Sequence, residues 1–331
     1  MDITVVGSGG WGTALAILLN GNGHNVTIWS FAQSEIDYIR ENHENALLKG
    51  VTVPEEIQLT TDISCVSGKK LVVSATPSFA VRSTAKLMAP YLDRDAIIVS
   101  VTKGIERDTS LRMTEIIAEV TGNTVAALSG PTHAEEVGRK IPTGCVVACP
   151  DRAVAEKVQD IFMCDRFRVY ICDDIAGVEL GAALKNIYAL IAGILDGAGC
   201  GDNTKALMMT RGLTESARLG VAMGGRKETF AGLSGVGDLI VTCCSMHSRN
   251  HRCGILIGQG KDVQTAMKEV GAVVEGYYAS ASAHQLAEKY GIEMPIAEAA
   301  YHALYEGGTV SDAIGGLMRR APRHETESSW L

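Results

Sequence analysis

The stretch GSGGWGTALA, residues 7–16, decides the fold of the first half of the chain. It follows the apolar run 3–6 (ITVV) and opens a pattern typical of a helix, so a strand–turn–helix unit is expected. Gly7, Gly9 and Gly12 have the spacing G-x-G-x-x-G, which permits a tight turn, close approach of a pyrophosphate and helix–strand packing. The motif therefore predicts a dinucleotide site, and the alternative is a glycine-rich turn without a ligand.

Short runs rich in valine and isoleucine alternate with helical segments through the first half of the chain. Such runs are expected when both faces of a parallel sheet are covered, so we predict an α/β fold with an N-terminal Rossmann-type, doubly wound sheet. Helices are expected over 31–45 and 78–90. The predicted strands are 2–6, 25–29, 71–75, 96–101, 125–129 and 144–148.

Beyond about residue 175 the strand pattern nearly disappears, and apolar residues recur at helical spacing. We therefore predict a dinucleotide-binding Rossmann domain over 1–175, an all-helical substrate and catalytic domain over 176–320, and a polar tail over 321–331 that is expected to be frayed. The expected helices are 173–197, 204–224, 261–270, 276–291 and 296–307.

The composition of the 331-residue chain limits the classes of function. With 30 Lys and Arg against 38 Asp and Glu, the net charge of −8 argues against nonspecific nucleic-acid binding but leaves anionic small molecules open.

Nine cysteines without a C-x-x-C pair indicate a reducing compartment rather than disulfides or zinc. The N-terminus enters a strand directly, and a lysine interrupts the most hydrophobic of the long apolar runs. We therefore expect a cytoplasmic protein without a secretory signal or membrane span.

The end of the second predicted strand bears on the choice of dinucleotide. A Rossmann domain that prefers NAD usually has Asp or Glu there, which binds the adenosine ribose. Here the strand ends in Trp29 and continues as Ser30-Phe31-Ala32, with neither an acid nor a cation, and Arg40 is two helical turns away. The opening motif therefore predicts a dinucleotide without deciding between NAD and NADP.

A single lysine interrupts the most apolar predicted helix. Between Glu179 and Asp196, Lys185 is the only charged residue of sixteen. Burial would disfavour its ammonium form and lower its pKa toward neutrality, which suits a general acid or base. The alternative is an amphipathic helix whose lysine extends to water. The polar neighbour Asn186 favours a site.

Two segments of the helical half carry polar residues in patterns that suit ligand binding. Gly235-Val236-Gly237-Asp238 has short glycine spacing that lets the backbone approach a ligand, and Thr242 follows. Ser248-Arg249-Asn250 lies at a predicted helix start, where it can hold a phosphate. The alternative is a surface loop with a helix cap, which the spacing alone favours.

Two further candidates follow predicted strands of the sheet. Lys103, in Thr102-Lys103-Gly104, comes directly after the fourth strand, and Ser129-Gly130-Pro131-Thr132-His133 follows the fifth. Both therefore lie at the carboxyl edge of the sheet, where open α/β folds bind ligands. His133 is either an acid/base or a polar loop residue.

Taken in order, the motifs resemble one family over nearly the whole chain: the bacterial-type NAD(P)-dependent sn-glycerol-3-phosphate dehydrogenases. The matching segments are GSGGWGTALA, TKGIE, SGPTHAEEV, LKNIYA, TRGLTE, GVGDLIVTC, SRN and VVEG. The resemblance implies reversible reduction of dihydroxyacetone phosphate to sn-glycerol 3-phosphate, which supplies phospholipid synthesis in the cytoplasm. It also implies the two-domain fold predicted above and a homodimer.

The resemblance assigns roles by position. Lys185 is the implied proton acceptor, Lys103 lies near cofactor and substrate, and Asp238 is a substrate-site carboxylate. No metal is expected. The implied substrate contacts are Lys103, Gly130, Thr132, Lys185, Asn186, Asp238 and the phosphate-binding turn Ser248, Arg249 and Asn250. The implied cofactor contacts are Gly7, Gly9, Gly10, Trp11, Gly12, Phe31, Lys103, Ala134, Arg249, Val273 and Glu275.

The chain departs from the family pattern at several positions. Many members have Ser in place of Gly10, usually Ser in place of Thr132, and His or Arg at the positions of Phe31 and Ala32. A cation beside the adenosine ribose would favour NADP, and its absence removes that preference. We therefore expect use of NAD or NADP, with NADH equal or modestly favoured.

Three other functions remain open from the sequence. A related dehydrogenase could act on another hydroxy or keto acid, but the Ser248-Arg249-Asn250 turn argues against an unphosphorylated substrate. A noncatalytic dinucleotide sensor and a structural protein on the same fold would not need Lys103, Lys185 and Asp238 together.

Overall fold

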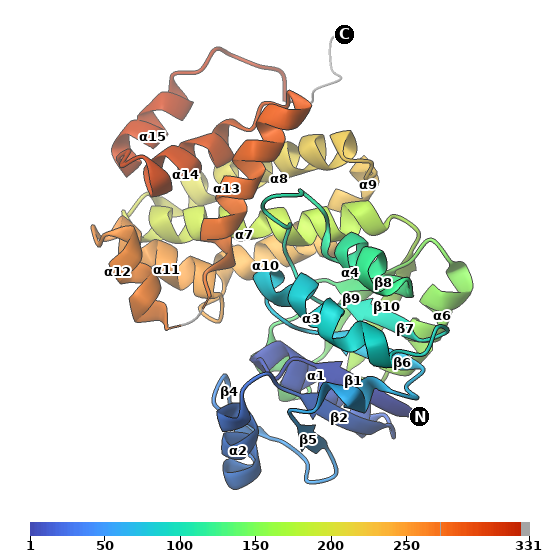
Figure 1. Ribbon diagram of the computed structural model, residues 1–331. Coiled ribbons are helices and arrows are strands. Elements are labelled where there is room, and N and C mark those ends of the chain that lie inside the picture. The colour runs from blue at the N-terminus through green and yellow to red at the C-terminus, as the bar shows by residue number, and fades with distance from the viewer. Residues whose placement is uncertain (272, 326–331) are drawn as a thin grey trace.

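The structure, a computed structural model, describes residues 1–271 and 273–325. A sheet region forms from the N-terminal half and a group of helices from the C-terminal half (Figure 1). Eight strands form one sheet in the order β10-β9-β8-β7-β6-β1-β2-β5. They are β1 (Asp2–Val6), β2 (Asn25–Trp29), β5 (Gln58–Thr60), β6 (Leu71–Ser74), β7 (Ile97–Ser100), β8 (Thr124–Ser129), β9 (Thr143–Ala148) and β10 (Phe167–Cys172).

The six strands from β5 to β8 are parallel, which confirms the predicted doubly wound sheet. Strand β9 pairs antiparallel with β8, so the predicted strand 144–148 is present but its expected parallel direction was wrong. Strands β5 and β10 were not predicted. Strand β5 has only three residues, and the edge strand β10 alternates buried with exposed positions, so neither gives the apolar run of a central strand.

Both faces of the sheet are covered, because successive residues of a strand point to opposite faces. Val5 packs in the core shared with α1 (Gly10–Gly21) and α6 (Arg152–Phe162), on the face that also carries α5 (Ala134–Gly138). Its neighbour Val6 packs in the core shared with α3 (Val81–Met88) and α4 (Met113–Thr121).

Helix α2 (Gln33–Asn42) is shorter than the expected 31–45. It ends because His43 adopts a left-handed conformation with φ of 50°. The chain then forms a small hairpin of β3 (Glu44–Asn45) and β4 (Leu48–Thr52), which was not predicted. Short 3₁₀ turns cover Ile63–Val66, Ser78–Ala80 and Ala89–Tyr91.

Helix α7 (Ile175–Gly197) lies at the centre of the helical region (Figure 1). By length and composition α7 could cross a membrane, but 94% of its apolar window is buried inside the protein.

The tail predicted over 321–331 is described only to residue 325, and 326–331 lie outside the described residues. The other helices are α8 (Gly201–Ala222), α9 (Lys227–Phe230), α10 (Asp238–Cys244) preceded by a π-turn (Leu233–Gly237), α11 (Arg249–Gly258), α12 (Val263–Val270), α13 (Glu275–Tyr290), α14 (Pro295–Tyr305) and α15 (Val310–Met318).

Glycines allow α7 and α11 to pack with their backbones almost in contact. A β-carbon added at Gly193 of α7 would overlap the carbonyl oxygen of His251, and one added at Gly254 of α11 would overlap the carbonyl oxygen of Leu190. Gly197 and Gly258 repeat the arrangement one turn further on. This packing fixes the start of α11 relative to the middle of α7, where Lys185 lies.

We predict that Gly254→Ala destabilises the protein by about 2 kcal/mol or more, because the added methyl group must force α7 and α11 apart. Gly316→Ala is the matched control, since a β-carbon there meets nothing within 4 Å. In helix α15 it should be neutral or stabilising by up to about 1 kcal/mol. Urea unfolding of both variants measures the difference, and a Gly254→Ala protein as stable as the control would contradict the packing argument.

Candidate active site

The glycine loop leaves open space beside Gly9. A β-carbon at Gly7, where φ is +126°, would lie 2.6 Å from the carbonyl oxygen of Ala75, and one at Gly12 would overlap the backbone of Gly7. These two glycines are therefore required by the packing of the protein itself. A β-carbon at Gly9 would meet nothing within 4 Å. Packing does not require a glycine there, whereas close approach of a pyrophosphate would.

The start of α1 suits an anion. The helix begins at Gly10 without a side-chain cap and without an acidic residue in its first turn, so its amide groups can bind phosphate oxygens. A β-carbon at Gly10 would lie 2.7 Å from the carbonyl oxygen of Leu47, which explains the absence of a larger residue. The indole Nε1 of Trp11 is buried and has no hydrogen-bond partner among the described residues. The loop therefore fits a dinucleotide.

One carboxylate joins the two lysines that the sequence analysis singled out. Asp238 accepts a hydrogen bond from Lys185 Nζ on Oδ1 and another from Lys103 Nζ on Oδ2, each at 2.6 Å. Asp238 is 1% exposed, and the Lys185 side chain is 7% exposed. Lys185 therefore does not extend to water, and the segment around Asp238 is not a surface loop.

Burial and charge act together on this cluster. Burial lowers the pKa of Lys185 to about 8, the charge of Lys103 acts in the same direction, and Asp238 opposes both. Burial alone would raise the pKa of Asp238, but the charges and hydrogen bonds of the two lysines outweigh it and hold this pKa below its ordinary value. The cluster thus keeps Asp238 charged and brings Lys185 close to the point where it can gain or lose a proton near neutral pH.

Thr242 also contacts Lys185, although it was noted in the sequence without an assigned role. Its hydroxyl accepts a hydrogen bond from Lys185 Nζ and donates one to the carbonyl oxygen of Asp238 at 2.6 Å. Because Thr242 follows Asp238 by four residues on α10, both side chains lie on one face of that helix. This spacing is the signal that could have identified Thr242.

Loops at the carboxyl edge of the sheet hold Lys103. Thr102 Oγ1 donates to the carbonyl oxygen of Thr76 at 2.6 Å, which ties the loop after β7 to the loop after β6. Lys103 Nζ donates to the carbonyl oxygen of Gly130 at 3.1 Å, and Thr132 Oγ1 donates to the same oxygen at 3.2 Å. The loops after three neighbouring strands therefore meet at the cluster. Ala134 begins α5 directly after the third of these loops.

Three helices converge beside Lys185 through two buried amides. Asn250 of α11 donates from Nδ2 to Asn186 Oδ1 of α7 at 3.0 Å, and its own Oδ1 accepts from the backbone N–H of Gly276 in α13 at 2.8 Å. Both amide side chains therefore link residues that lie far apart in the chain.

The turn before α11 presents a cation to solvent. Ser248 caps the helix by accepting from the backbone N–H of His251, and Arg249 is exposed at the first helical position. Among the described residues, Arg249 has no side-chain hydrogen bond or ion pair. Burial raises the pKa of Glu275 above its ordinary value, and the charge of Arg249 opposes part of that rise. An exposed guanidinium at a helix start suits a phosphate group.

Three other residues predicted to contact the cofactor are Glu275, Val273 and Phe31. Glu275 accepts from Ser78 Oγ at 3.0 Å and so connects α13 with the loop after β6, while Val273 is half-buried just before it. Ser78 was not identified from the sequence. Phe31 is 85% exposed after the end of β2 and has no packing role.

His133 lies beside the lysine cluster without bonding to it. Burial lowers its pKa, and the charges of Lys185 and Lys103 act in the same direction. Its Nε2 lies 3.4 Å from the carbonyl oxygen of Val241, and its ring lies 5.7 Å from that of His247. The geometry therefore favours the loop-residue interpretation over direct proton transfer.

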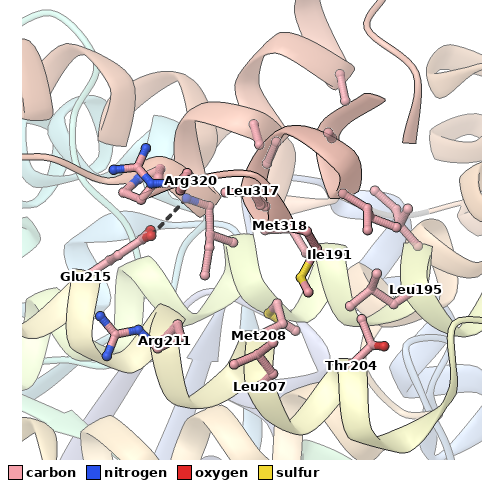
Figure 2. Close-up of a pocket in the computed structure, with 18 of the residues that line it drawn as sticks. Ile191, Leu195, Thr204, Leu207, Met208, Arg211, Glu215, Leu317, Met318 and Arg320 are labelled. Carbon is pink, nitrogen blue, oxygen red and sulfur yellow. Dashed lines mark hydrogen bonds between the residues drawn. The ribbon is translucent and has the colours of Figure 1, made fainter. Parts of the chain in front are cut away.

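A separate apolar cavity lies between α7, α8, α14, α15 and the chain around residue 320 (Figure 2). Ile191, Leu195 and Met208 are among its apolar lining residues, and Arg211 and Glu215 are among its polar ones. Neither lysine of the cluster, nor Asp238 or Arg249, lines this cavity. It is therefore not part of the candidate active site.

Comparison with known proteins places this geometry in a family. Residues 2–155 match the N-terminal and residues 174–315 the C-terminal domain described as NAD-dependent glycerol-3-phosphate dehydrogenase. The chain is 51% identical to glycerol-3-phosphate dehydrogenase [NAD(P)+] of Moorella thermoacetica over 99% of its length and 98% of the relative's. It is 50% identical to the Fusobacterium nucleatum enzyme, with 99% of each chain covered. A crystal structure of the Coxiella burnetii glycerol-3-phosphate dehydrogenase, 35% identical, superposes with a TM-score of 0.93 over 96% of this chain and 99% of that one. The chain belongs to the NAD-dependent glycerol-3-phosphate dehydrogenase family.

Proposed function

We propose that this protein interconverts dihydroxyacetone phosphate and sn-glycerol 3-phosphate by hydride transfer with NAD(P)H. The observation that carries the proposal is the pair of lysines on Asp238, at the junction of the sheet and the helical region. A ketone that accepts hydride develops negative charge on its oxygen. Two cations beside a buried carboxylate can stabilise that charge and supply the proton.

Lys185 carries the proton in this proposal. In reduction its ammonium form gives a proton to the oxygen of the substrate, and in oxidation its neutral form takes the hydroxyl proton. A pKa of about 8 lets one group perform both steps near neutral pH. Asp238 and Thr242 hold Nζ in place, while Lys103, whose Nζ donates to the carbonyl oxygen of Gly130, supplies a second positive charge at the site.

Arg249 holds the phosphate group of the substrate. Its exposed guanidinium and the helix start capped by Ser248 attract a dianion, and the bond between Asn250 and Asn186 fixes this turn relative to Lys185. The phosphate thereby positions the reacting carbon beside Nζ, which converts binding free energy into orientation.

The dinucleotide is held by the glycine loop. The open space at Gly9 and the uncapped start of α1 fit its pyrophosphate, and Gly7, Gly10, Trp11 and Gly12 shape that loop. The bound nicotinamide supplies or accepts the hydride. Lys103, Ala134, Arg249, Val273 and Glu275 also contact the cofactor, and Gly130 and Thr132 contact the substrate.

The family resemblance supports three further parts of the proposal. Residues 1–175 bind the dinucleotide, 176–320 supply the substrate site, and 321–331 form a tail. The enzyme is a cytoplasmic homodimer, and its product feeds phospholipid synthesis. Sedimentation equilibrium tests the assembly: a mass of two chains is expected, and a monomer across the concentration range would contradict it.

The first prediction concerns the protonation of Lys185. The rate of glycerol 3-phosphate oxidation should rise with pH and level off above about 8, because neutral Lys185 is the base; the reduction rate should fall through the same range. Lys185→Ala should lose about 10²-fold or more in kcat.

Lys157→Ala is the control for Lys185→Ala, because Lys157 is exposed on α6, in the sheet region. It should retain wild-type rates and pH profiles. Dinucleotide binding to Lys185→Ala, measured separately, verifies that the variant is folded. A Lys185→Ala enzyme with near-normal kcat would remove Lys185 from the mechanism.

The second prediction concerns Arg249. Arg249→Ala should raise the KM for dihydroxyacetone phosphate about ten- to a hundredfold, because charge-assisted hydrogen bonds contribute about 1.5–3 kcal/mol. The slow reduction of unphosphorylated dihydroxyacetone should change much less. Arg252→Ala, which removes an exposed cation one turn further along α11, is the matched control. Equal losses on the two substrates would show that Arg249 does not hold the substrate phosphate.

A further inference from the structure

The carboxylate missing from the end of β2 is supplied from α2. The residues after the strand, Ser30-Phe31-Ala32, contain no acid. Glu35, in the first turn of α2, turns back toward the strand, and its Oε2 accepts a hydrogen bond from Ser30 Oγ at 2.6 Å. The same oxygen accepts a hydrogen bond from Ser8 Oγ. A carboxylate therefore lies at the end of β2, although no acid stands there in the sequence.

Its two partners place this carboxylate at the dinucleotide loop. Ser8 is the second residue of the loop that begins at Gly7, and Ser30 directly follows β2. Ser8 is 5% exposed and Ser30 is 1% exposed, and their Oγ atoms lie 2.8 Å apart. In a Rossmann domain the adenosine ribose lies where the glycine loop and the end of the second strand meet. Glu35 is fixed at that junction.

The carboxylate of Glu35 retains capacity to bind a ligand. Ser8 and Ser30 are its only hydrogen-bond partners among the described residues, and both donate to Oε2. The residue as a whole is exposed. An outward carboxylate oxygen accepts a hydrogen bond from a hydroxyl and repels a phosphate.

The neighbouring cation does not offset this charge. Arg40 is the only cation of α2, and its Nη1 lies 3.3 Å from Asp37 Oδ1. Arg40 also lines a hollow with His43 and Pro54, beside the C-terminal end of α2, whereas Glu35 lies in the first turn. The positive charge that a 2′-phosphate requires is therefore not supplied by α2.

We propose that Glu35 is a specificity-determining residue that accepts a hydrogen bond from the 2′-hydroxyl of NAD and disfavours the 2′-phosphate of NADP. This inference rests on the proposed function only in requiring that the glycine loop binds a dinucleotide. A charge-assisted hydrogen bond present with one ligand and replaced by like-charge repulsion with the other changes affinity by at least about tenfold. The protein therefore binds NADH at least about ten times more tightly than NADPH.

Direct binding without substrate tests the proposal. The dissociation constants of NADH and NADPH are measured by quenching of tryptophan fluorescence at one salt concentration, for the wild type, Glu35→Gln and Glu41→Gln. Glu35→Gln removes the charge at nearly constant size. Glu41→Gln removes the same charge from an exposed position at the other end of α2. Glu35→Gln should reduce the preference for NADH about tenfold, mainly by tightening NADPH, and Glu41→Gln should leave it unchanged.

The outcomes separate this inference from the proposed function. Equal affinities of the wild type for NADH and NADPH, or an unchanged ratio in Glu35→Gln, would overturn the role of Glu35 and leave the dehydrogenase function standing. Failure of the wild type to bind either dinucleotide would overturn both. Retained NADH binding by Glu35→Gln also verifies that the variant is folded.

Discussion

The structure depends on one buried carboxylate shared by two lysines. Asp238 is almost inaccessible to solvent and accepts a hydrogen bond from each lysine. With two cations and one anion, the cluster of Lys103, Lys185 and Asp238 carries a net positive charge at a site that is largely buried from solvent. Burial and the charge of Lys103 lower the pKa of Lys185, while Asp238 keeps it from falling further. Removing any one of these three charged groups would change the balance of charge around the other two. The protonation of Lys185 therefore depends on the positions of both Lys103 and Asp238.

The rest of the fold fixes three distant segments around this carboxylate. Lys103 follows β7 at the sheet edge, Lys185 lies in the middle of α7, and Asp238 begins α10 after a π-turn. Glu179, almost two turns before Lys185 on α7, accepts hydrogen bonds from Arg112 and from the backbone N–H of Thr114, which ties the central helix to the sheet region. The glycine contacts between α7 and α11 fix the position of the Ser248-Arg249-Asn250 turn relative to Lys185. Rigid elements therefore carry the reacting groups, as orientation of a small substrate requires.

Local patterns in the sequence predicted the glycine loop, the alternating strands and helices, and the long central helix, because each is a property of consecutive residues. Periodicity left Lys185 undecided between a site and a surface position, and spacing alone favoured a surface loop around Asp238. Their contact spans 53 residues, and the contact of Lys103 with Asp238 spans 135, so no local pattern contains them. Glu35 was not identified for a related reason. The motif places the carboxylate that binds the ribose directly at the end of the second strand, whereas the carboxylate of Glu35 belongs to α2 and lies back against the end of β2.

The decisive measurement is the pKa of Lys185 in the folded protein. NMR of protein labelled with ¹³C at lysine Cε follows each ammonium group through pH, and Lys185→Met identifies the resonance of Lys185. Lys185 should titrate near pH 8, and its pKa should fall further in Asp238→Asn, where the opposing charge is gone. A Lys185 resonance that titrates near 10.5, the ordinary value for lysine, would show that the burial and charges of the cluster do not set its protonation.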